Sequence, residues 1–403
     1  MTNDDLREEV LKEEPLQETE ENQINEKPTP SEDDFGGAQP FAEEKEYSKE
    51  EVEKILENIR NHQREFRYYK PLPRGVTEET YDEYEKARSC GKIIGITAII
   101  IWALVMGYSL IYGFVIGFAA AFGVNLEGIL SDPAVNNLMQ IVMTICMFTL
   151  PFLIAAKVNK YKLAELVPLT KSREGTKLPY FLFGLGFCAF AQIAVSKAAT
   201  IFENMGFEYN LPESENAEGI FGFLLAVIST AIVPALMEEF GCRGIMFGIA
   251  ERKCGTVFAL IISSAIFGLI HGNFVQIPFA FLVGLVLGVI RIKTGSLWIS
   301  ILIHGVNNFV SVVMDYAGDI IGEDVANTIY TAFLALCMLA AVIGVGLLSK
   351  KGKEEYDLVE ETPENENSKA TLKEKLAWFF KTPAIIIAIV LFVGEACLFL
   401  LEL

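Results

Sequence analysis

The sequence contains little that could organise a disulfide-linked or nucleic-acid-binding domain. Its seven cysteines form no CxxC pair, and none falls in a segment that we expect on the outer side of a membrane, which excludes a disulfide framework and argues against a zinc ribbon. The formal net charge of −19 argues against nucleic acid as a partner. The chain starts with polar and acidic residues, so we expect no signal peptide and expect the first hydrophobic segment to direct membrane insertion.

Long apolar segments are what the sequence has in abundance, with 52% hydrophobic residues over 403 positions. About 20 consecutive apolar residues cross the hydrocarbon core of a bilayer, so these segments predict an all-α, polytopic transmembrane helical bundle of about 8–9 spans. The fifth and sixth segments are short, and one of them could be tilted or re-entrant. The expected segments are Ile93–Phe122, Leu138–Ala156, Tyr180–Ile201, Ile220–Met237 with a continuation to Ala250, Val257–Ile270, Val275–Ile290, Leu297–Met314, Ile329–Leu348 and Ala384–Leu401.

The amino-terminal arm is polar and acidic. Residues 1–47 are rich in Glu, Asn, Pro and Ser, which predicts a disordered cytoplasmic tail. Ser48 and Glu51 have the spacing of a capping box, and apolar residues then recur at helical spacing from Val52 to Ile59. We therefore expect a juxtamembrane helical region over 48–92, with a first helix that ends before Pro71 and a second over Thr77–Arg88.

The basic residues indicate the orientation in the membrane. Lys and Arg follow the second, fourth, sixth and eighth segments, whereas the alternate loops Gly123–Asn137, Glu203–Gly219 and Asp315–Asn327 contain neither. Cytoplasmic loops carry the excess of Lys and Arg. We expect a cytoplasmic amino terminus and, with nine spans, a carboxyl terminus on the outer side.

Charged residues cluster at the end of the fourth segment. A charge inside a span costs about 2.5–3.5 kcal/mol on insertion scales, so each should have a reason. Glu239 and Arg243 are four residues apart and share a face of a helix, which predicts an ion pair. Glu238 points about 100° away from that face and has no local partner. It therefore needs a metal, a proton or a nearby histidine.

Two of the three histidines lie in apolar segments and could meet that need. His271 ends the fifth segment, and His304 lies in the seventh, with Asn308 one helical turn later on the same face. Asn307 lies close to that face as well. A carboxylate, two imidazoles and an amide form a set of ligands that suits zinc with an open position for water. The depth of these residues allows them to meet within the bilayer.

Three boxes in this order resemble the CAAX protease and bacteriocin-processing (CPBP) family, which includes the Rce1 prenyl-protein endopeptidase and the bacterial Abi proteins. The resemblance covers about a third of the chain, from Tyr180 to Met314, and no box departs from the pattern. The boxes are Glu238-Glu239-x-x-x-Arg243, Phe267-x-x-x-His271 and His304-x-x-x-Asn308.

The resemblance implies an intramembrane metalloprotease of the CPBP type that hydrolyses a peptide bond of a membrane-associated protein or peptide. In one mechanism, His271 and His304 hold zinc with Asn308 or a carboxylate, and Glu238 is the base for the zinc-bound water, whose pKa falls to about 7. In the other, no metal takes part: Glu238 and His271 activate water, while His304 and Asn308 stabilise the oxyanion. The implied catalytic residues are Glu238, His271, His304 and Asn308, with Glu239 and Arg243 as supporting residues and His271, His304 and Asn308 as metal ligands.

This interpretation divides the chain into a tail (1–47), a juxtamembrane region (48–92), two accessory spans with a cytoplasmic loop (93–178), the catalytic core (179–314) and carboxyl-terminal spans with a charged cytoplasmic loop at 350–382 (315–403). Glu395 lies in the last span outside every box, and the sequence assigns it no function. The alternative function is a non-catalytic transporter or a bacteriocin-immunity-type binding protein. We expect a prokaryotic cell membrane with membrane lipids as partners, and the sequence leaves the substrate and the oligomeric state open.

Overall fold

The computed structural model describes residues 48, 50–58, 72–173, 175–205, 219–350 and 368–401. The chain divides into two units, and the boundary in the sequence lies between Thr77 and Glu78. In the first unit, residues 50–58 are helical. The Ser48 N–H donates to Glu51 Oε2 at 2.9 Å and the Glu51 N–H donates to Ser48 Oγ at 3.3 Å, which confirms the predicted capping box. The predicted disordered tail and the predicted helix end before Pro71 lie outside the described residues.

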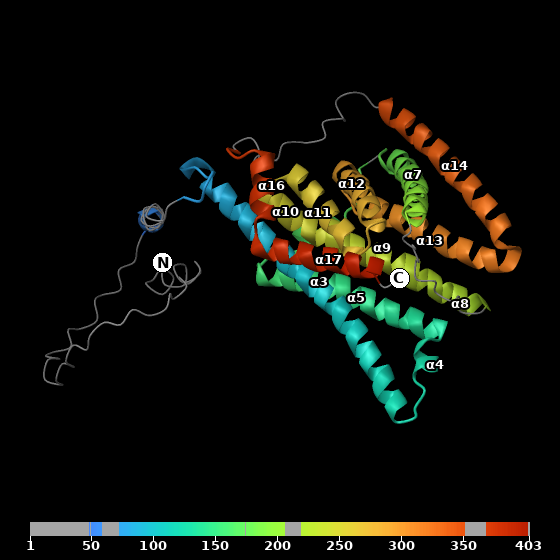
Figure 1. Ribbon diagram of the computed structural model, residues 1–403. Coiled ribbons are helices and arrows are strands. Elements are labelled where there is room, and N and C mark those ends of the chain that lie inside the picture. Colours follow the sequence, from blue (N-terminus) through green and yellow to red (C-terminus); the bar gives the residue numbers. More distant parts are fainter. Residues whose placement is uncertain are drawn as a thin grey trace. The chain divides into compact units, whose positions relative to one another are not determined.

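The described part of the second unit contains helices and no strand (Figure 1). Three short helices, η2 (Glu78–Thr80), α4 (Glu127–Leu130) and α6 (Leu163–Leu166), accompany the long ones. A continuous run over Gly219–Cys254 consists of α8 (Gly219–Ala226), η3 (Val227–Ile232), α9 (Val233–Glu238), η4 (Glu239–Met246) and α10 (Phe247–Cys254). The other helices are α3 (Tyr81–Ala121), α5 (Pro133–Val158), α7 (Lys177–Asn204), α11 (Thr256–Ile270), α12 (Gln276–Thr294), α13 (Trp298–Ile321), α14 (Glu323–Ser349), α16 (Leu372–Phe380) and α17 (Pro383–Leu401).

Each of the nine predicted hydrophobic segments contains a long helix, but the start of the first was predicted wrongly. The expected separate helix over Thr77–Arg88 is the first part of α3, which runs without interruption for 41 residues. No proline lies between Tyr81 and Ala121, so nothing stops the helix there. The part of the juxtamembrane region from Tyr81 to Lys92 and the first span therefore form one continuous helix.

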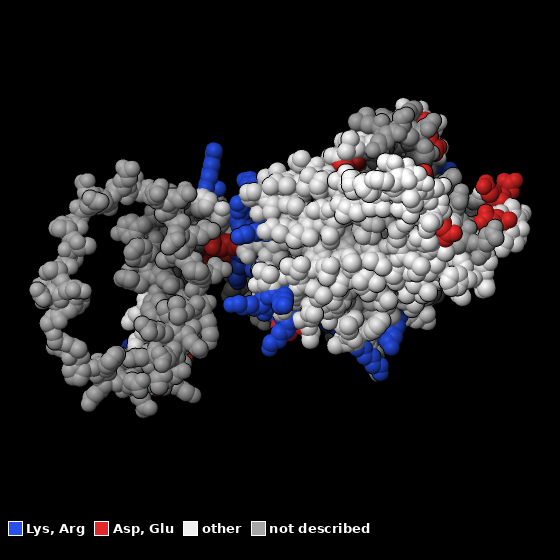
Figure 2. Space-filling view, turned by 90° about the horizontal axis from the view of Figure 1, so that it is seen from below, with Lys and Arg blue, Asp and Glu red and all other residues white. Residues whose placement is uncertain are grey.

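Among the described residues, seven helices are long and apolar enough to span a membrane, and α16 with α17 would make an eighth as a pair bent by 70°. At 15 residues, α11 is shorter than the roughly 20 residues that a crossing needs. In the second unit, most visible Lys and Arg side chains gather toward one end and several acids toward the other (Figure 2). The chain is an integral membrane protein with charges at the ends of its helices, and which end faces the cytoplasm stays a prediction.

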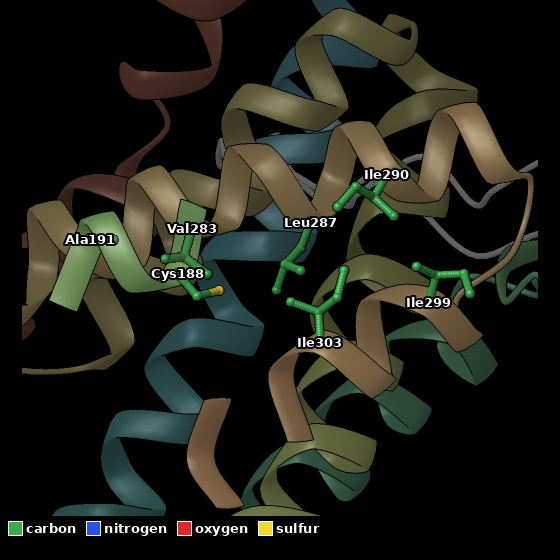
Figure 3. Close-up of a cluster of buried hydrophobic side chains, with 7 residues drawn as sticks. All are labelled: Cys188, Ala191, Val283, Leu287, Ile290, Ile299 and Ile303. Carbon is green, nitrogen blue, oxygen red and sulfur yellow. The ribbon is translucent and has the colours of Figure 1, made fainter. Parts of the chain in front are cut away.

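A hydrophobic cluster joins α7, α12 and α13 beside the polar residues of the core (Figure 3). Its aliphatic side chains fix the spacing between α12 and α13, and α7 covers both. The buried residues of this cluster are Cys188, Ala191, Val283, Leu287, Ile290, Ile299 and Ile303.

Glycines allow close helix packing in this core. A Cβ at Gly284 would lie 3.1 Å from Arg243 Nη2, and one at Gly288 would lie 2.5 Å from Leu260 Cδ1. In contrast, a Cβ at Gly113 or Gly117 would meet nothing within 4 Å. Glycines at this spacing are typical of close helix contacts in membranes. Gly284 and Gly288 of α12 therefore allow a close contact with neighbouring helices. Among the described residues, no atom lies close to Gly113 or Gly117 of α3.

Candidate active site

The most deeply buried part of the site is an ion pair on η4. Arg243 Nη1 lies 2.9 Å from Glu239 Oε1, and both side chains are fully buried. The guanidinium carbon of Arg243 lies 3.8 Å from the centre of the Phe267 ring, a cation–π contact. The predicted pair is confirmed, and Phe267 adds a contact that sequence reasoning missed even though Phe267 belongs to the second box.

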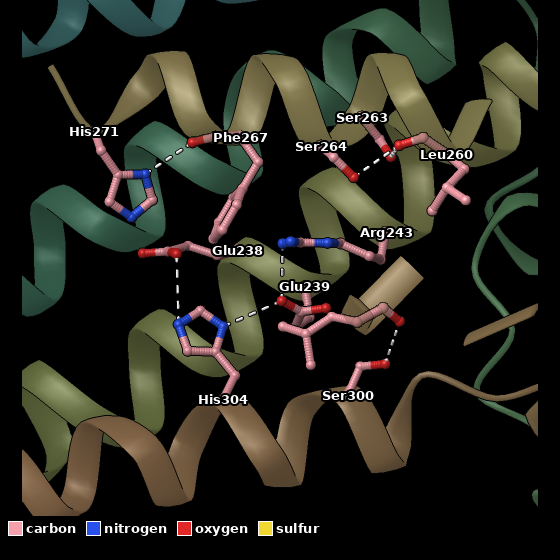
Figure 4. Close-up of polar contacts among 11 residues, drawn as sticks. Glu238, Glu239, Arg243, Leu260, Ser263, Ser264, Phe267, His271, Ser300 and His304 are labelled. Carbon is pink, nitrogen blue, oxygen red and sulfur yellow. Dashed lines mark hydrogen bonds and ion pairs between the residues drawn. The ribbon is translucent and has the colours of Figure 1, made fainter. Parts of the chain in front are cut away.

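His304 of α13 lies between the two glutamates (Figure 4). Its Nδ1 is 3.1 Å from Glu239 Oε1 and its Nε2 is 3.8 Å from Glu238 Oε2. A carboxylate only accepts hydrogen bonds, so Nδ1 donates to Glu239. Nε2 and the Glu238 oxygen then face each other too far apart for a direct hydrogen bond. Either a proton on Nε2 or a donor or cation placed between them makes this approach favourable.

His271 lies at the end of α11 and approaches from the other side of Glu238. Its Nδ1 is 2.8 Å from the carbonyl oxygen of Phe267, one turn earlier in the same helix. Because a carbonyl can only accept, Nδ1 carries the proton and the Nε2 lone pair points away from the helix. The ring is turned toward Glu238 in Figure 4 and packs edge-on against Phe267, with 4.8 Å between ring centres.

Asn308 is held by the backbone of the fourth predicted segment. Its Nδ2 donates to the Thr230 carbonyl at 3.2 Å, and its Oδ1 accepts from Asn307 Nδ2 at 3.2 Å. Thr230 lies four residues before Pro234, which has no N–H to donate to that carbonyl. The side chain of Asn308 thus supplies a donor where the helix lacks one, and Asn307 supports it.

Two π-helical turns flank Glu238. η3 ends at Ile232 and η4 begins at Glu239, so the α-helical stretch that contains Pro234 and Glu238 is six residues long. Pro234 lies in the first turn of α9, and the π-helical turn before it accommodates the proline within a continuous helical run. Such turns are frequent at functional sites, and these two set the directions of the neighbouring glutamates.

The histidines have the orientation of zinc ligands, but the set is incomplete. Each donates Nδ1–H to a backbone carbonyl or a carboxylate and keeps Nε2 for a metal, as ligating histidines do. Among the described residues, however, no three His, Cys, Asp or Glu side chains are placed to hold one ion. Asn308, the third predicted ligand, is bonded to Thr230 and Asn307. The geometry therefore provides two imidazole donors without a third, and zinc stays a prediction.

The site can activate a small polar molecule. The Glu238 side chain is 14% exposed and that of His304 is 11% exposed, whereas Glu239 and Arg243 are completely buried. The Glu238 carboxylate and the Nε2 atoms of His271 and His304 therefore lie in a partly accessible part of the site, next to the fully buried Glu239–Arg243 ion pair. General bases, metal ligands and oxyanion donors are the roles that such groups serve.

Comparison with known proteins finds that the same segment is similar to a family of endopeptidases. Residues 220–310 match the family described as Type II CAAX prenyl endopeptidase Rce1-like. The chain is also 32% identical over 106 residues to a Bacillus subtilis protein named "Putative membrane peptidase YdiL"; the match covers 25% of this chain and 43% of that relative's length. No solved structure matches. The three boxes all lie within residues 220–310, so they fall in the segment of this chain that is similar to the Rce1-like family.

Proposed function

We propose that the chain is an intramembrane endopeptidase that hydrolyses a peptide bond of a membrane-associated protein or peptide, with Glu238 as the base. The observation that carries the proposal is the place of Glu238, which is partly accessible and faces the Nε2 atom of His304. The similarity to an Rce1-like endopeptidase family and to a protein named as a membrane peptidase supports this reaction class.

In the proposed reaction, Glu238 takes a proton from a water molecule whose oxygen attacks the scissile carbonyl carbon. The C=O electron pair moves onto oxygen, and the resulting oxyanion is stabilised by donors in the site. When the intermediate collapses, the C–N bond breaks and the protonated Glu238 gives its proton to the leaving amine. Water is consumed, one carboxylic acid and one amine form (a carboxylate and an ammonium once the second proton of the water moves to the amine), and Glu238 returns to its initial state.

The neighbouring residues keep the base in place. Glu239 and Arg243 fix Nδ1 of His304, so its Nε2 is directed at Glu238. His271 presents a second Nε2 from the opposite side and can hold or move a proton. If zinc binds, His271 and His304 would hold it, and the metal would polarise the water. In the reaction without a metal, the oxyanion donors are His304 and Asn308. His304 donates only when its Nε2 also carries a proton, and Asn308 donates only when its amide leaves the Thr230 carbonyl.

The test compares membranes from cells that lack the chain with membranes from cells that produce the wild type or Glu238→Gln. New protein amino termini are catalogued by mass spectrometry. We expect a set of termini that appears with the wild type and disappears with Glu238→Gln. Glu127→Gln, which changes an exposed acid in α4, is the matched control and should retain them. Termini that persist in Glu238→Gln would refute the base role of Glu238. A wild type that produces no new termini would favour the transporter or immunity-type alternative.

A further inference from the structure

Glu395, in a helix outside the family segment, lies against the turn that carries His271. A Cβ added to Gly272 would be 3.4 Å from Glu395 Oε1 and 3.5 Å from its carboxyl carbon. Gly272 has a φ of +68°, which favours glycine, and it directly follows His271. The last helix thus places a third carboxylate beside the active site.

This carboxylate lacks a partner that would neutralise it. No ion pair among the described residues includes Glu395, and its Oε2 atom is buried without a hydrogen-bond partner. The indole N–H of Trp102 is close enough to interact with the carboxyl, but it does not reach hydrogen-bond geometry. An ionisable residue without a counter-charge inside a membrane bundle is costly and indicates a functional site.

Contacts with α3 hold the bent helix pair α16–α17, which carries Glu395. At its start, Glu83 of α3 lies 3.1 Å from Lys375 Nζ of α16, and Glu83 Oε1 accepts the Lys369 N–H at 2.6 Å. Further along, a Cβ at Gly95 would lie 2.6 Å from the backbone of Ala384, so α3 and α17 are in direct backbone contact. The two helices run side by side in Figure 1. The packing of α16 and α17 on α3 therefore fixes where Glu395 lies.

The carboxylate of Glu395 and the turn beside it are both partly accessible. Glu395, Gly272 and His271 are all partly exposed, while Ala396 and Asn273 beside them are buried. One carboxylate oxygen is closed off and the other faces the turn, so an incoming group would meet the open oxygen next to His271. A carboxylate accepts hydrogen bonds only, and its unbalanced charge favours a cation over a neutral group.

We propose that Glu395 is a substrate-binding residue of this active site, and that its carboxylate receives an ammonium or guanidinium group of the peptide substrate beside His271. The proposal rests on the proposed peptidase function and extends it to the substrate class: peptides or membrane proteins with a basic residue near the cleaved bond. The basic group would supply the charge that the described part of the chain does not.

The experiment uses the detergent-purified full chain with Glu238→Gln, which removes the proposed base so that binding is measured without cleavage. Two equimolar pools of random ten-residue peptides differ only in that arginine in one is replaced by neutral citrulline in the other. We expect arginine peptides to be retained about tenfold better or more, since hydrogen bonds to a charged group are strong. Adding Glu395→Gln should bring the ratio to about one, Glu395→Asp should keep part of the preference, and the control Glu127→Gln should keep all of it.

A second arm measures cleavage of the same pools by the otherwise unchanged chain, with and without Glu395→Gln. Cleavage without a preference for arginine, or a preference that survives Glu395→Gln in a folded protein, overturns the subsite and leaves the peptidase proposal standing. Binding that depends on Glu395, with no cleavage of either pool or of membrane proteins, supports the subsite and counts against the peptidase. Equal retention of both pools together with no cleavage counts against both.

Discussion

Glu238 and Glu239 are neighbours in the sequence, yet they belong to two different layers of the site. The closed layer consists of Glu239, Arg243 and Phe267; its ion pair is completely buried, and the Phe267 ring covers the guanidinium. The open layer consists of Glu238, His271 and His304, whose polar atoms face one another in a partly accessible place. His304 contacts both layers, with one ring nitrogen toward each.

The difference shows how a membrane helix can contain a reactive carboxylate. Within the closed layer, the charge of Glu239 is balanced by Arg243, and its geometry is fixed by packing. Glu238 has no such partner on its own helix, so its carboxylate is free to act as the proposed base. The neighbouring His304 is held in place by Glu239 of the closed layer. A buried ion pair adds little net stability, but removing one partner leaves a costly unpaired charge. We interpret the closed layer as support and the open layer as the reacting part.

Glu238→Gln should have the largest effect on activity. It removes the proposed base with almost no change in shape, so cleavage of a responsive substrate should fall by roughly 10²–10⁴-fold, the contribution of general acid–base catalysis. The unfolding midpoint should stay close to that of the wild type, because no salt bridge to Lys or Arg is lost. A folded Glu238→Gln variant with unchanged cleavage would remove the distinction between the layers.

Arg243→Met should have the largest effect on stability. The variant leaves Glu239 buried without its counter-charge, so we expect a loss of about 3–5 kcal/mol in the free energy of unfolding. Unfolding of the purified protein by a denaturing detergent measures this. The double variant Glu239→Gln/Arg243→Met should be more stable than Arg243→Met alone, since it contains no unpaired charge. Equal stability of the single variant and the wild type would contradict a supporting role for the closed layer.

Zinc content provides a third test, because both histidines keep Nε2 for a metal. If zinc binds as predicted, the purified wild type contains about one equivalent, while His271→Ala and His304→Ala contain none. Glu239→Gln should then weaken binding by about 10–100-fold, the usual effect of changing the partner of a ligating histidine. Mass spectrometry of the folded proteins measures the content. A wild type free of metal that still cleaves its substrate would favour the mechanism in which Glu238 and His271 activate water.

Patterns that repeat within one helix were predictable, and contacts between distant helices were not. Hydrophobic length predicted where the apolar helices of the described residues lie, and the four-residue spacing predicted the Glu239–Arg243 pair. The three boxes indicated that Glu238 and His304 would meet, and they lie 3.8 Å apart. No spacing in the sequence could place Glu395 beside Gly272, because that contact depends on how the bent pair α16–α17 packs on α3. The π-helical turns around Glu238 were missed for a related reason: hydrophobic patterns do not distinguish them from α-helix.

The smallest effect concerns Asn308, which we assign to neither the open nor the closed layer. The family resemblance implies a catalytic role for it, whereas its hydrogen bonds to Thr230 and Asn307 are structural. Loss of its hydrogen bond to the Thr230 carbonyl in Asn308→Ala should cost about 1 kcal/mol of stability. If the amide compensates for the N–H that Pro234 lacks, the same change should cost less in a Pro234→Ala background, where the helix can supply its own donor. Unfolding measurements on the four proteins of this cycle give the coupling. A double variant that regains stability but not cleavage would place Asn308 in the open layer, whereas recovery of both would assign it to the support.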